Sequence, residues 1–288
     1  MPQAIIENRY VETNGVRLHA VAAGPVSGPP AILLHGFPEF WFAWRWQIAA
    51  LAEAGYYVLA PDQRGYNLSD KPSGIGAYNL DVLADDVIGL IENTGHSKAY
   101  LIGHDWGGSV AWWTANKYPE RIEKLAVLNV PHHTVMKREV ARNLAQFRRS
   151  WYIYFFQAPF LPEFCARAFN WRLLVLALLQ TSRPDTFSPE DLNAYRQAWS
   201  QPLAISCMIN WYRALLRRPP RRLHSRRITV PTLLIWGARD RFLDRKMAAL
   251  SIGFCDHGRL ALIETATHWV QHEEPDRVNR LLLDFLKE

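Results

Sequence analysis

Short continuous apolar runs alternate with longer stretches of helical periodicity along most of the chain. Such runs are typical of strands in a parallel sheet that is covered on both faces. Two of the helical stretches are followed by glycine, at Gly55 and Gly95, where helices commonly end. We therefore predict an α/β fold with a mostly parallel, doubly wound sheet. The predicted strands are 16–24, 30–36, 56–61, 98–105, 124–130, 229–236 and 260–263, and the predicted helices are 42–54, 80–93 and 109–117, with one more at the C-terminus.

The alternation of strands and helices stops after Pro131. Residues 132–227 are rich in arginine, leucine and aromatic side chains with helical spacing, and ITVPTLLIWG then restores the strand pattern. We predict a core formed by residues 1–131 and 228–288, with residues 132–227 inserted as a helical cap. Ligand sites in such sheets lie at the carboxyl ends of the strands, so a cap over that edge would shield a site from water.

Composition excludes several classes of protein. The chain has 288 residues, of which 49% are hydrophobic, which argues against disorder. Its longest candidate for a membrane span, residues 173–179, is too short, and MPQAIIENRY has no signal-peptide pattern. Three scattered cysteines, Cys165, Cys207 and Cys255, argue against a disulfide framework or a zinc site. We expect a cytoplasmic protein without a metal or another cofactor.

The net charge of +6 comes partly from an arginine run at residues 217–227. A patch for nucleic acid or acidic lipid is one interpretation, and a solvated linker around Pro219 and Pro220 is the other. We favour the linker and expect no nucleic-acid partner. The twelve tryptophans indicate an aromatic-rich pocket. The oligomeric state stays open, with a homodimer as one option.

The segment LIGHDWGGSV holds the strongest catalytic signal. Asp105 occupies the position of serine in the G-x-S-x-G nucleophile elbow, and the flanking glycines permit the sharp turn that lifts a side chain into a cleft. A helix N-cap is the alternative interpretation. Downstream, Asp240 and His268 follow predicted strands, so nucleophile, acid and histidine occur in the order found in hydrolases. Asp244 is the alternative acid.

The chain resembles the epoxide hydrolases of the α/β-hydrolase fold in the segments HGFPEFWFAWRWQI, GHDWGG, INWYRAL and THWVQHEEP. The likeness extends over residues 16–284 and is weakest over 159–206. It implies an α/β-hydrolase core with a helical cap, and an epoxide and water as substrates. The carboxylate of Asp105 would attack an epoxide carbon and form an alkyl ester. Water activated by His268, with Asp240 as its orienting partner, would hydrolyse this ester to release a diol.

The resemblance also implies roles for residues around this triad. Backbone amides of Phe37 and Trp106 match the oxyanion hole, and the Phe37–Pro38 bond matches a cis peptide. Tyr152 and Tyr212 match two cap tyrosines that protonate the opening ring, a task that suits a phenol with a pKa of about 10. The neighbouring Tyr154 is the alternative to Tyr152 for the first of these tyrosines.

The remaining site candidates are less specific. Glu39 resembles a family glutamate near the hydrolytic water, although a surface carboxylate at a helix start is the alternative. His104 and Arg64 are interpreted as structural supports. The expected apolar and water-binding lining consists of Phe37, Trp106, Phe155, Phe156, Trp269 and Glu39.

Rival functions remain. A haloalkane dehalogenase forms the same aspartate ester, but such enzymes carry the motif HGN-P where this chain has HGFP. The asparagine of that motif supplies a side-chain N–H, which Phe37 lacks. Fluoroacetate dehalogenases, which act on a haloacid, share HGFP but usually carry arginine where this chain has Trp106. An ester or lactone hydrolase would prefer serine at position 105. A ligand receptor on a hydrolase scaffold could keep the whole triad, and turnover of a simple epoxide would distinguish it.

Overall fold

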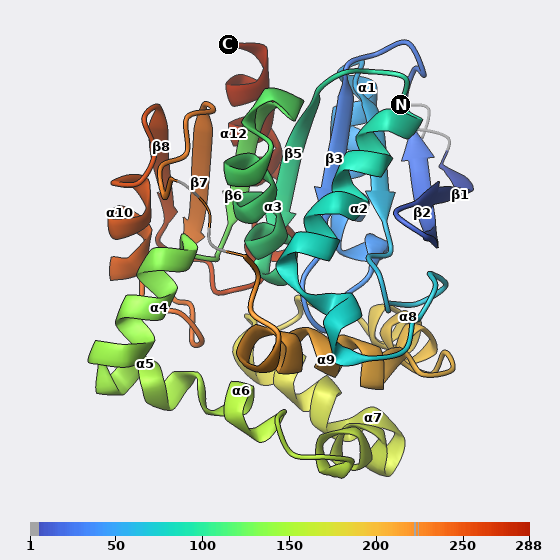
Figure 1. Ribbon diagram of the computed structural model, residues 1–288, viewed down its shortest axis with the longest axis vertical. Coiled ribbons are helices and arrows are strands. Elements are labelled where there is room, and N and C mark those ends of the chain that lie inside the picture. The colour runs from blue at the N-terminus through green and yellow to red at the C-terminus, as the bar shows by residue number, and fades with distance from the viewer. Residues whose placement is uncertain (1–5, 222, 224) are drawn as a thin grey trace.

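An eight-stranded sheet forms the centre of the computed structural model, which describes residues 6–221, 223 and 225–288. The strand order is β1-β2-β4-β3-β5-β6-β7-β8, and only the pairings of β2 with β1 and β4 are antiparallel (Figure 1). The predicted mostly parallel α/β sheet is therefore confirmed. The strands are β1 Glu7–Thr13, β2 Val16–Ala23, β3 Pro30–Leu34, β4 Tyr57–Pro61, β5 Ala99–His104, β6 Ile122–Leu128, β7 Thr232–Gly237 and β8 Gly258–Ile263.

Helices cover both faces of the sheet because successive strand residues point to opposite sides. In β3, Ile32 and Leu34 pack into the core under α2 and α3, whereas Ala31 and Leu33 pack into the core under α1 and α12. Both layers are visible in Figure 1, with α2 and α3 in front. The bounds are α1 Arg45–Glu53, α2 Leu80–Asn93, α3 Asp105–Lys117, α10 Lys246–Ile252, α11 Val270–Glu273 and α12 Pro275–Lys287, with short 3-10 helices η1 Trp41–Trp44, η2 Ile75–Tyr78 and η3 Pro119–Arg121.

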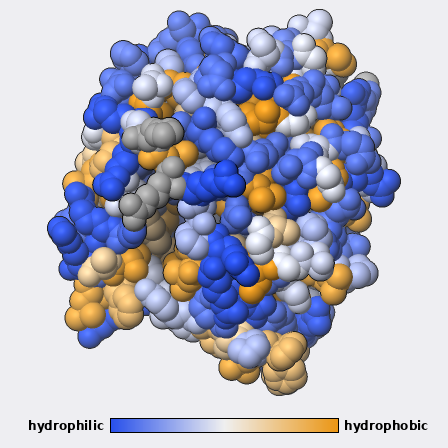
Figure 2. Space-filling view, viewed as in Figure 1, coloured by the Kyte–Doolittle hydropathy of each residue, from blue (hydrophilic) through white to orange (hydrophobic). Residues whose placement is uncertain are grey.

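In the described part of the chain, six helices lie between β6 and β7 and gather beyond one end of the sheet (Figure 1). Figure 2 shows orange, apolar side chains along the lower edge of the same view, where α5 and α7 lie. Positions 222 and 224, within the arginine run predicted as a linker, and residues 1–5 of the predicted core lie outside the described residues. The six helices are α4 His133–Arg142, α5 Leu144–Arg149, α6 Trp151–Phe155, α7 Leu161–Thr181, α8 Pro189–Trp199 and α9 Ala204–Arg217.

Two tryptophans fasten these helices to the core. The indole N–H of Trp199, in α8, donates to the carbonyl of Pro38 at 2.6 Å, and that of Trp211, in α9, donates to the carbonyl of Arg64 at 3.0 Å. Both indoles are almost fully buried. The tryptophans, which the sequence predicts in a pocket, therefore also pack in the core and join the inserted helices to it.

The structure differs from the sequence prediction at several element ends. Strand β1 has no predicted counterpart, because it is an edge strand of which only Val11 and Thr13 are buried, and its apolar signal is weak. Helix α3 begins at Asp105 rather than at residue 109, because Gly107 and Gly108 disguise its first turn. Strand β7 begins at Thr232, directly after Pro231, since proline cannot donate to a sheet.

Candidate active site

Asp105 sits on the sharp turn between β5 and α3. Its backbone has φ of 49°, in the left-handed region that non-glycine residues rarely adopt. A Cβ on Gly107 would lie 2.1 Å from the carbonyl oxygen of Leu34, and one on Gly36 would lie 2.5 Å from the Cβ of Asp105. Only glycine fits these two positions. The loop after β3 and the first turn of α3 can therefore approach closely on either side of Asp105.

The carboxylate of Asp105 does not act as a helix cap. Its Oδ1 accepts the backbone N–H of Phe37 at 2.9 Å, from the loop after β3, and the residue before the helix is His104. The side chain keeps 17% of its surface exposed. The bond between Phe37 and Pro38 is cis. One of the two expected oxyanion-hole amides therefore already points at the carboxylate.

His268 lies between two carboxylates. Its Nδ1–H donates to Oδ2 of Asp240 at 2.7 Å, and its Nε2 lies 3.6 Å from Oδ2 of Asp105. The other carboxylate oxygen of Asp240 accepts the backbone N–H groups of Phe242 and Leu243 at 2.7 and 3.0 Å. The Nδ2 of Asn129 donates to Oδ2 of Asp240 at 2.8 Å. The acid is thus held on both oxygens, and the histidine is oriented toward the elbow.

Two residues near this triad test the sequence interpretation. Asp244, the alternative acid, accepts the backbone N–H of Lys246 at 3.0 Å and makes no contact with His268 in the described residues. Asn129, which the sequence analysis did not select, donates to Asp240 and accepts the N–H of Gly237 at 2.8 Å. Its position at the carboxyl end of β6, beside β5 and β7, is the signal that could have identified it.

The charges of the triad reinforce one another. Burial disfavours the charged imidazole of His268, but Asp240 and Asp105 outweigh this effect and raise its pKa to about 10. Burial likewise favours a neutral carboxyl at Asp105, but His268 outweighs it, and the pKa of Asp105 is lowered below its ordinary value. At neutral pH the resting site therefore holds an ionised Asp105 beside a protonated His268.

Tyr152 and Tyr212 reach the site from two different helices of the insertion. Their rings lie 5.8 Å apart, and the ring of Tyr212 is 5.2 Å from Phe37 and 5.0 Å from Trp106. Burial, and then the negative charge of Asp105, raise the pKa of both phenols above the ordinary value. Tyr154 is 44% exposed, so α6 turns Tyr152 inward and Tyr154 outward.

Glu39 is enclosed rather than exposed at a helix start. The residue is 1% exposed. Its carboxylate accepts hydrogen bonds from Nδ1 of His104 at 2.9 Å, from Nε2 of His272 at 2.7 Å and from the hydroxyl of Tyr195, in α8, at 3.2 Å. His104 in turn donates from Nε2 to the carbonyl of His268 at 2.9 Å. Burial opposes ionisation of Glu39, but the two histidine hydrogen bonds outweigh it and hold its pKa well below the ordinary value.

The aromatic lining differs in part from the sequence expectation. Phe156 packs on Phe37 and Tyr212, at ring distances of 5.5 and 4.8 Å, and Trp269 packs on His268 at 5.1 Å. The described ring pairs of Phe155 are with Trp151 and Phe156 alone, so it lies behind the lining. Phe242, which the sequence analysis did not select, lies 5.1 Å from His268 and 5.9 Å from Tyr152. Its place two residues after Asp240 was the available signal.

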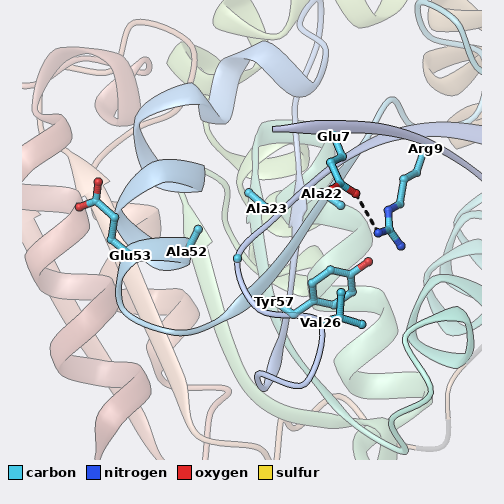
Figure 3. Close-up of a pocket in the computed structure, with 9 residues that line it drawn as sticks. Glu7, Arg9, Ala22, Ala23, Val26, Ala52, Glu53 and Tyr57 are labelled. Carbon is cyan, nitrogen blue, oxygen red and sulfur yellow. Dashed lines mark hydrogen bonds and ion pairs between the residues drawn. The ribbon is translucent and has the colours of Figure 1, made fainter. Parts of the chain in front are cut away.

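A surface hollow elsewhere holds none of these residues. Figure 3 shows it beside an ion pair between Glu7 and Arg9, with Tyr57 and Val26 on its wall. Tyr57 begins β4 and pairs with Pro30, which begins β3. The hollow therefore lies at the amino ends of the parallel strands, opposite the edge that carries Asp105. This hollow is therefore remote from Asp105, Asp240 and His268.

Other kinds of site leave few traces in the part of the chain that the structure describes. No group of three or more histidine, cysteine, aspartate or glutamate side chains is arranged there to hold a metal ion. Cys165, Cys207 and Cys255 are free thiols. Among the described helices, none combines the length and apolar character that crossing a bilayer requires. The supporting interpretation of Arg64 fits its buried ion pair with Asp86, 2.6 Å apart.

Comparisons with known proteins bear on this geometry. The model of the alpha/beta hydrolase fold family matches residues 29–275. The chain is 48% identical to the AB hydrolase superfamily protein YfhM of Bacillus subtilis, with 98% of each chain covered. It is 42% identical to epoxide hydrolase 4 of Homo sapiens, over 96% of this chain and 78% of that protein. A crystal structure of a Bacillus megaterium epoxide hydrolase bound to an inhibitor superposes with a TM-score of 0.89 at 31% identity, covering 97% of this chain and 100% of that one.

Proposed function

The chain belongs to the epoxide hydrolases of the α/β-hydrolase fold family, and we propose that it converts apolar alkyl or aryl epoxides into vicinal diols through an ester on Asp105. One observation carries the proposal: a strained, partly exposed carboxylate lies beside a histidine, and two phenols of the insertion are close enough to feel its charge. A serine hydrolase would need no such phenols. We assign residues 132–227 to the cap and the rest of the chain to the core.

In the first step the Asp105 carboxylate attacks an epoxide carbon. The carbon–oxygen bond of the ring breaks as the ester bond forms, and the electron pair stays on the ring oxygen. Tyr152 and Tyr212 face that oxygen, and one of them donates its proton to it. The phenolate that results is reprotonated by the proton that His268 releases before the second step. Because the pKa of each phenol is raised, each stays protonated at neutral pH and can act as an acid.

In the second step water attacks the carbonyl carbon of the ester. His268 accepts a proton from this water, and Asp240 stabilises the resulting imidazolium. The backbone N–H groups of Phe37 and Trp106 donate hydrogen bonds to the former carbonyl oxygen and stabilise its negative charge. One such donor typically raises the rate by a factor of roughly 10²–10³. As this intermediate collapses, the bond between the carbonyl carbon and the alkyl oxygen breaks. The departing alkoxide takes the proton of the new carboxyl group, so the diol leaves and Asp105 is ionised again. In this scheme Glu39 acts through His104, which holds the backbone of His268.

A single turnover in oxygen-18 water tests the proposal. The diol takes one oxygen from the epoxide and one from Asp105, while the solvent oxygen enters the aspartate. We expect the label in the Asp105 peptide and an unlabelled diol. A labelled diol from an unlabelled enzyme would mean direct attack of water on the ring. A parallel panel of epoxides and haloalkanes, assayed for diol and halide, checks the substrate class.

Replacing both Tyr152 and Tyr212 with phenylalanine should slow ring opening by a factor of roughly 10²–10⁴. Each substitution removes a proton donor but keeps the ring packing seen between the two residues. Hydrolysis of the preformed ester should change far less, since the phenols serve the departing alkoxide. Single-turnover rates of ester formation and decay measure the two steps separately. Tyr154→Phe, at an exposed neighbour, is the matched control. Equal slowing of both steps would contradict the role.

The two steps should also differ in pH dependence. His268 must be neutral to accept a proton from water, and its raised pKa in the resting site depends on both Asp240 and Asp105. Ester formation removes the charge of Asp105, so the pKa of His268 falls in the ester. Ester hydrolysis should therefore rise with pH and level off below pH 10, while ring opening stays nearly constant between about pH 6 and 9. Stopped-flow single turnovers across that range provide the measurement, and identical profiles would refute the assignment.

The cellular location is part of the proposal as well. Three unpaired cysteines favour a reducing compartment, and we place the enzyme in the cytoplasm on that ground.

A further inference from the structure

The outer side of the insertion exposes large apolar side chains in unusual number. Phe169 is 85% exposed, Phe160 83%, Phe164 72% and Trp151 61%. Scattered apolar residues are normal on protein surfaces, but a contiguous group marks an interaction site. Figure 2 shows two groups of apolar side chains at this end of the molecule, one at the lower left, where Figure 1 places α5, and one at the bottom, where it places α7. We call this surface the cap outer face; it comprises Leu144, Phe147, Trp151, Tyr154, Phe160, Leu161, Phe164, Phe169 and Leu173.

A distorted turn inside α7 exposes the ring of Phe169. Three consecutive residues inside it, Phe169, Asn170 and Trp171, have left-handed φ values of 52°, 55° and 64°. Trp171 is only 8% exposed and donates from its indole N–H to Oγ of Ser200 at 2.9 Å. The turn therefore fixes Trp171 inside the cap and leaves Phe169 in solvent. Strain of this kind persists where the surrounding structure maintains it, and often at functional surfaces.

The segment that carries the exposed rings is also rich in basic side chains. Exposed arginines stand in the same segment, and none of them belongs to an ion pair in the described part of the chain. The acidic residues of segment 137–173, Glu139 and Glu163, are already paired with Arg138 and Arg213. The cap outer face is therefore both apolar and positively charged. The arginines are Arg142, Arg148, Arg149, Arg167 and Arg172.

We propose that the cap outer face binds the surface of an anionic lipid bilayer. Rings would enter the boundary between headgroups and acyl chains, and the arginines would contact the acidic headgroups, a combination typical of interfacial helices. A second copy of this chain is a poorer partner, because facing two such surfaces brings unpaired arginines together. The segment would lie on the bilayer, since no described helix qualifies to span one. If the proposed function holds, this places the cap against the phase into which apolar epoxides partition.

Vesicle flotation tests the proposal without any measurement of turnover. The full chain is mixed with vesicles of phosphatidylcholine and phosphatidylglycerol, or of phosphatidylcholine alone. We expect binding to the anionic vesicles, weakened by added salt and much reduced on the neutral ones. The triple variant Phe160→Ser, Phe164→Ser and Phe169→Ser should bind more than about a hundredfold less tightly. Arg148→Gln with Arg149→Gln should weaken binding by roughly fivefold for each charge.

Matched controls change the same chemistry on the core. Val26→Ser with Leu250→Ser removes exposed apolar side chains, and Arg259→Gln with Arg280→Gln removes exposed charges. Both should bind like the unaltered protein, and circular dichroism verifies that every variant is folded. Failure to float with anionic vesicles, or full binding by the triple variant, would overturn the proposal. It would also be overturned by a dimer in sedimentation equilibrium that dissociates in the triple variant, since a second copy would then cover the face.

Discussion

Replacing Asp105 with asparagine should lower the rate of diol formation by at least about 10⁴-fold, the scale seen when a covalent nucleophile is removed. An amide carries no negative charge and is a poor nucleophile toward an epoxide carbon. The fold should survive, because asparagine keeps the shape of the side chain and an oxygen that can accept the N–H of Phe37. Diol released from an aryl epoxide, measured in freshly purified protein, gives the result.

Slow deamidation of the new asparagine could restore aspartate, so the active-site peptide must be weighed by mass spectrometry in every preparation. Asp244→Asn is the matched control, because Asp244 is a loop carboxylate four residues after Asp240 that forms no hydrogen bond or ion pair with His268 among the described residues. It should keep nearly full activity. A fully active protein that still carries asparagine at position 105 would rule out the covalent scheme.

The sheet could be predicted because its central strands are buried on both faces. Strands such as β3 and β4 are buried at every position, which leaves continuous apolar runs in the sequence. Edge strand β1 has no such run, so only pairing with β2 identifies it. The first turn of α3 was hidden for another reason: Gly107 and Gly108 are poor helix formers, and they are required there by the close approach of Leu34 and Val130.

The candidate triad was visible because chain order, spacing and neighbouring glycines all agree. The supporting residues were harder to find. His272 and Tyr195 both donate hydrogen bonds to Glu39 although they lie far apart in the sequence, and no local pattern links them. Asn129 had a usable signal in its strand position, but an amide next to a carboxylate is too common to select alone. Contacts of this kind are set by tertiary packing rather than by any short motif.

Replacing His268 with glutamine should separate the two chemical steps and leave the ester trapped on Asp105. The nucleophile remains, and its carboxylate still accepts the backbone N–H of Phe37, which favours the ionised form. Glutamine cannot accept the proton of the attacking water, so hydrolysis of the ester should slow by about 10⁴-fold or more.

Mass spectrometry of the protein after exposure to an epoxide should show one adduct per chain, on the peptide that contains Asp105. Diol should appear in the first turnover at most, whereas the unaltered enzyme should accumulate little adduct. His257→Gln, at an exposed histidine on the core, is the control and should behave like the unaltered protein. An unmodified Asp105 peptide in the His268→Gln variant would mean that the imidazole is needed for ring opening. That result would move His268 from the water step to the first step, and the carboxylate between histidine and phenols would then need another explanation.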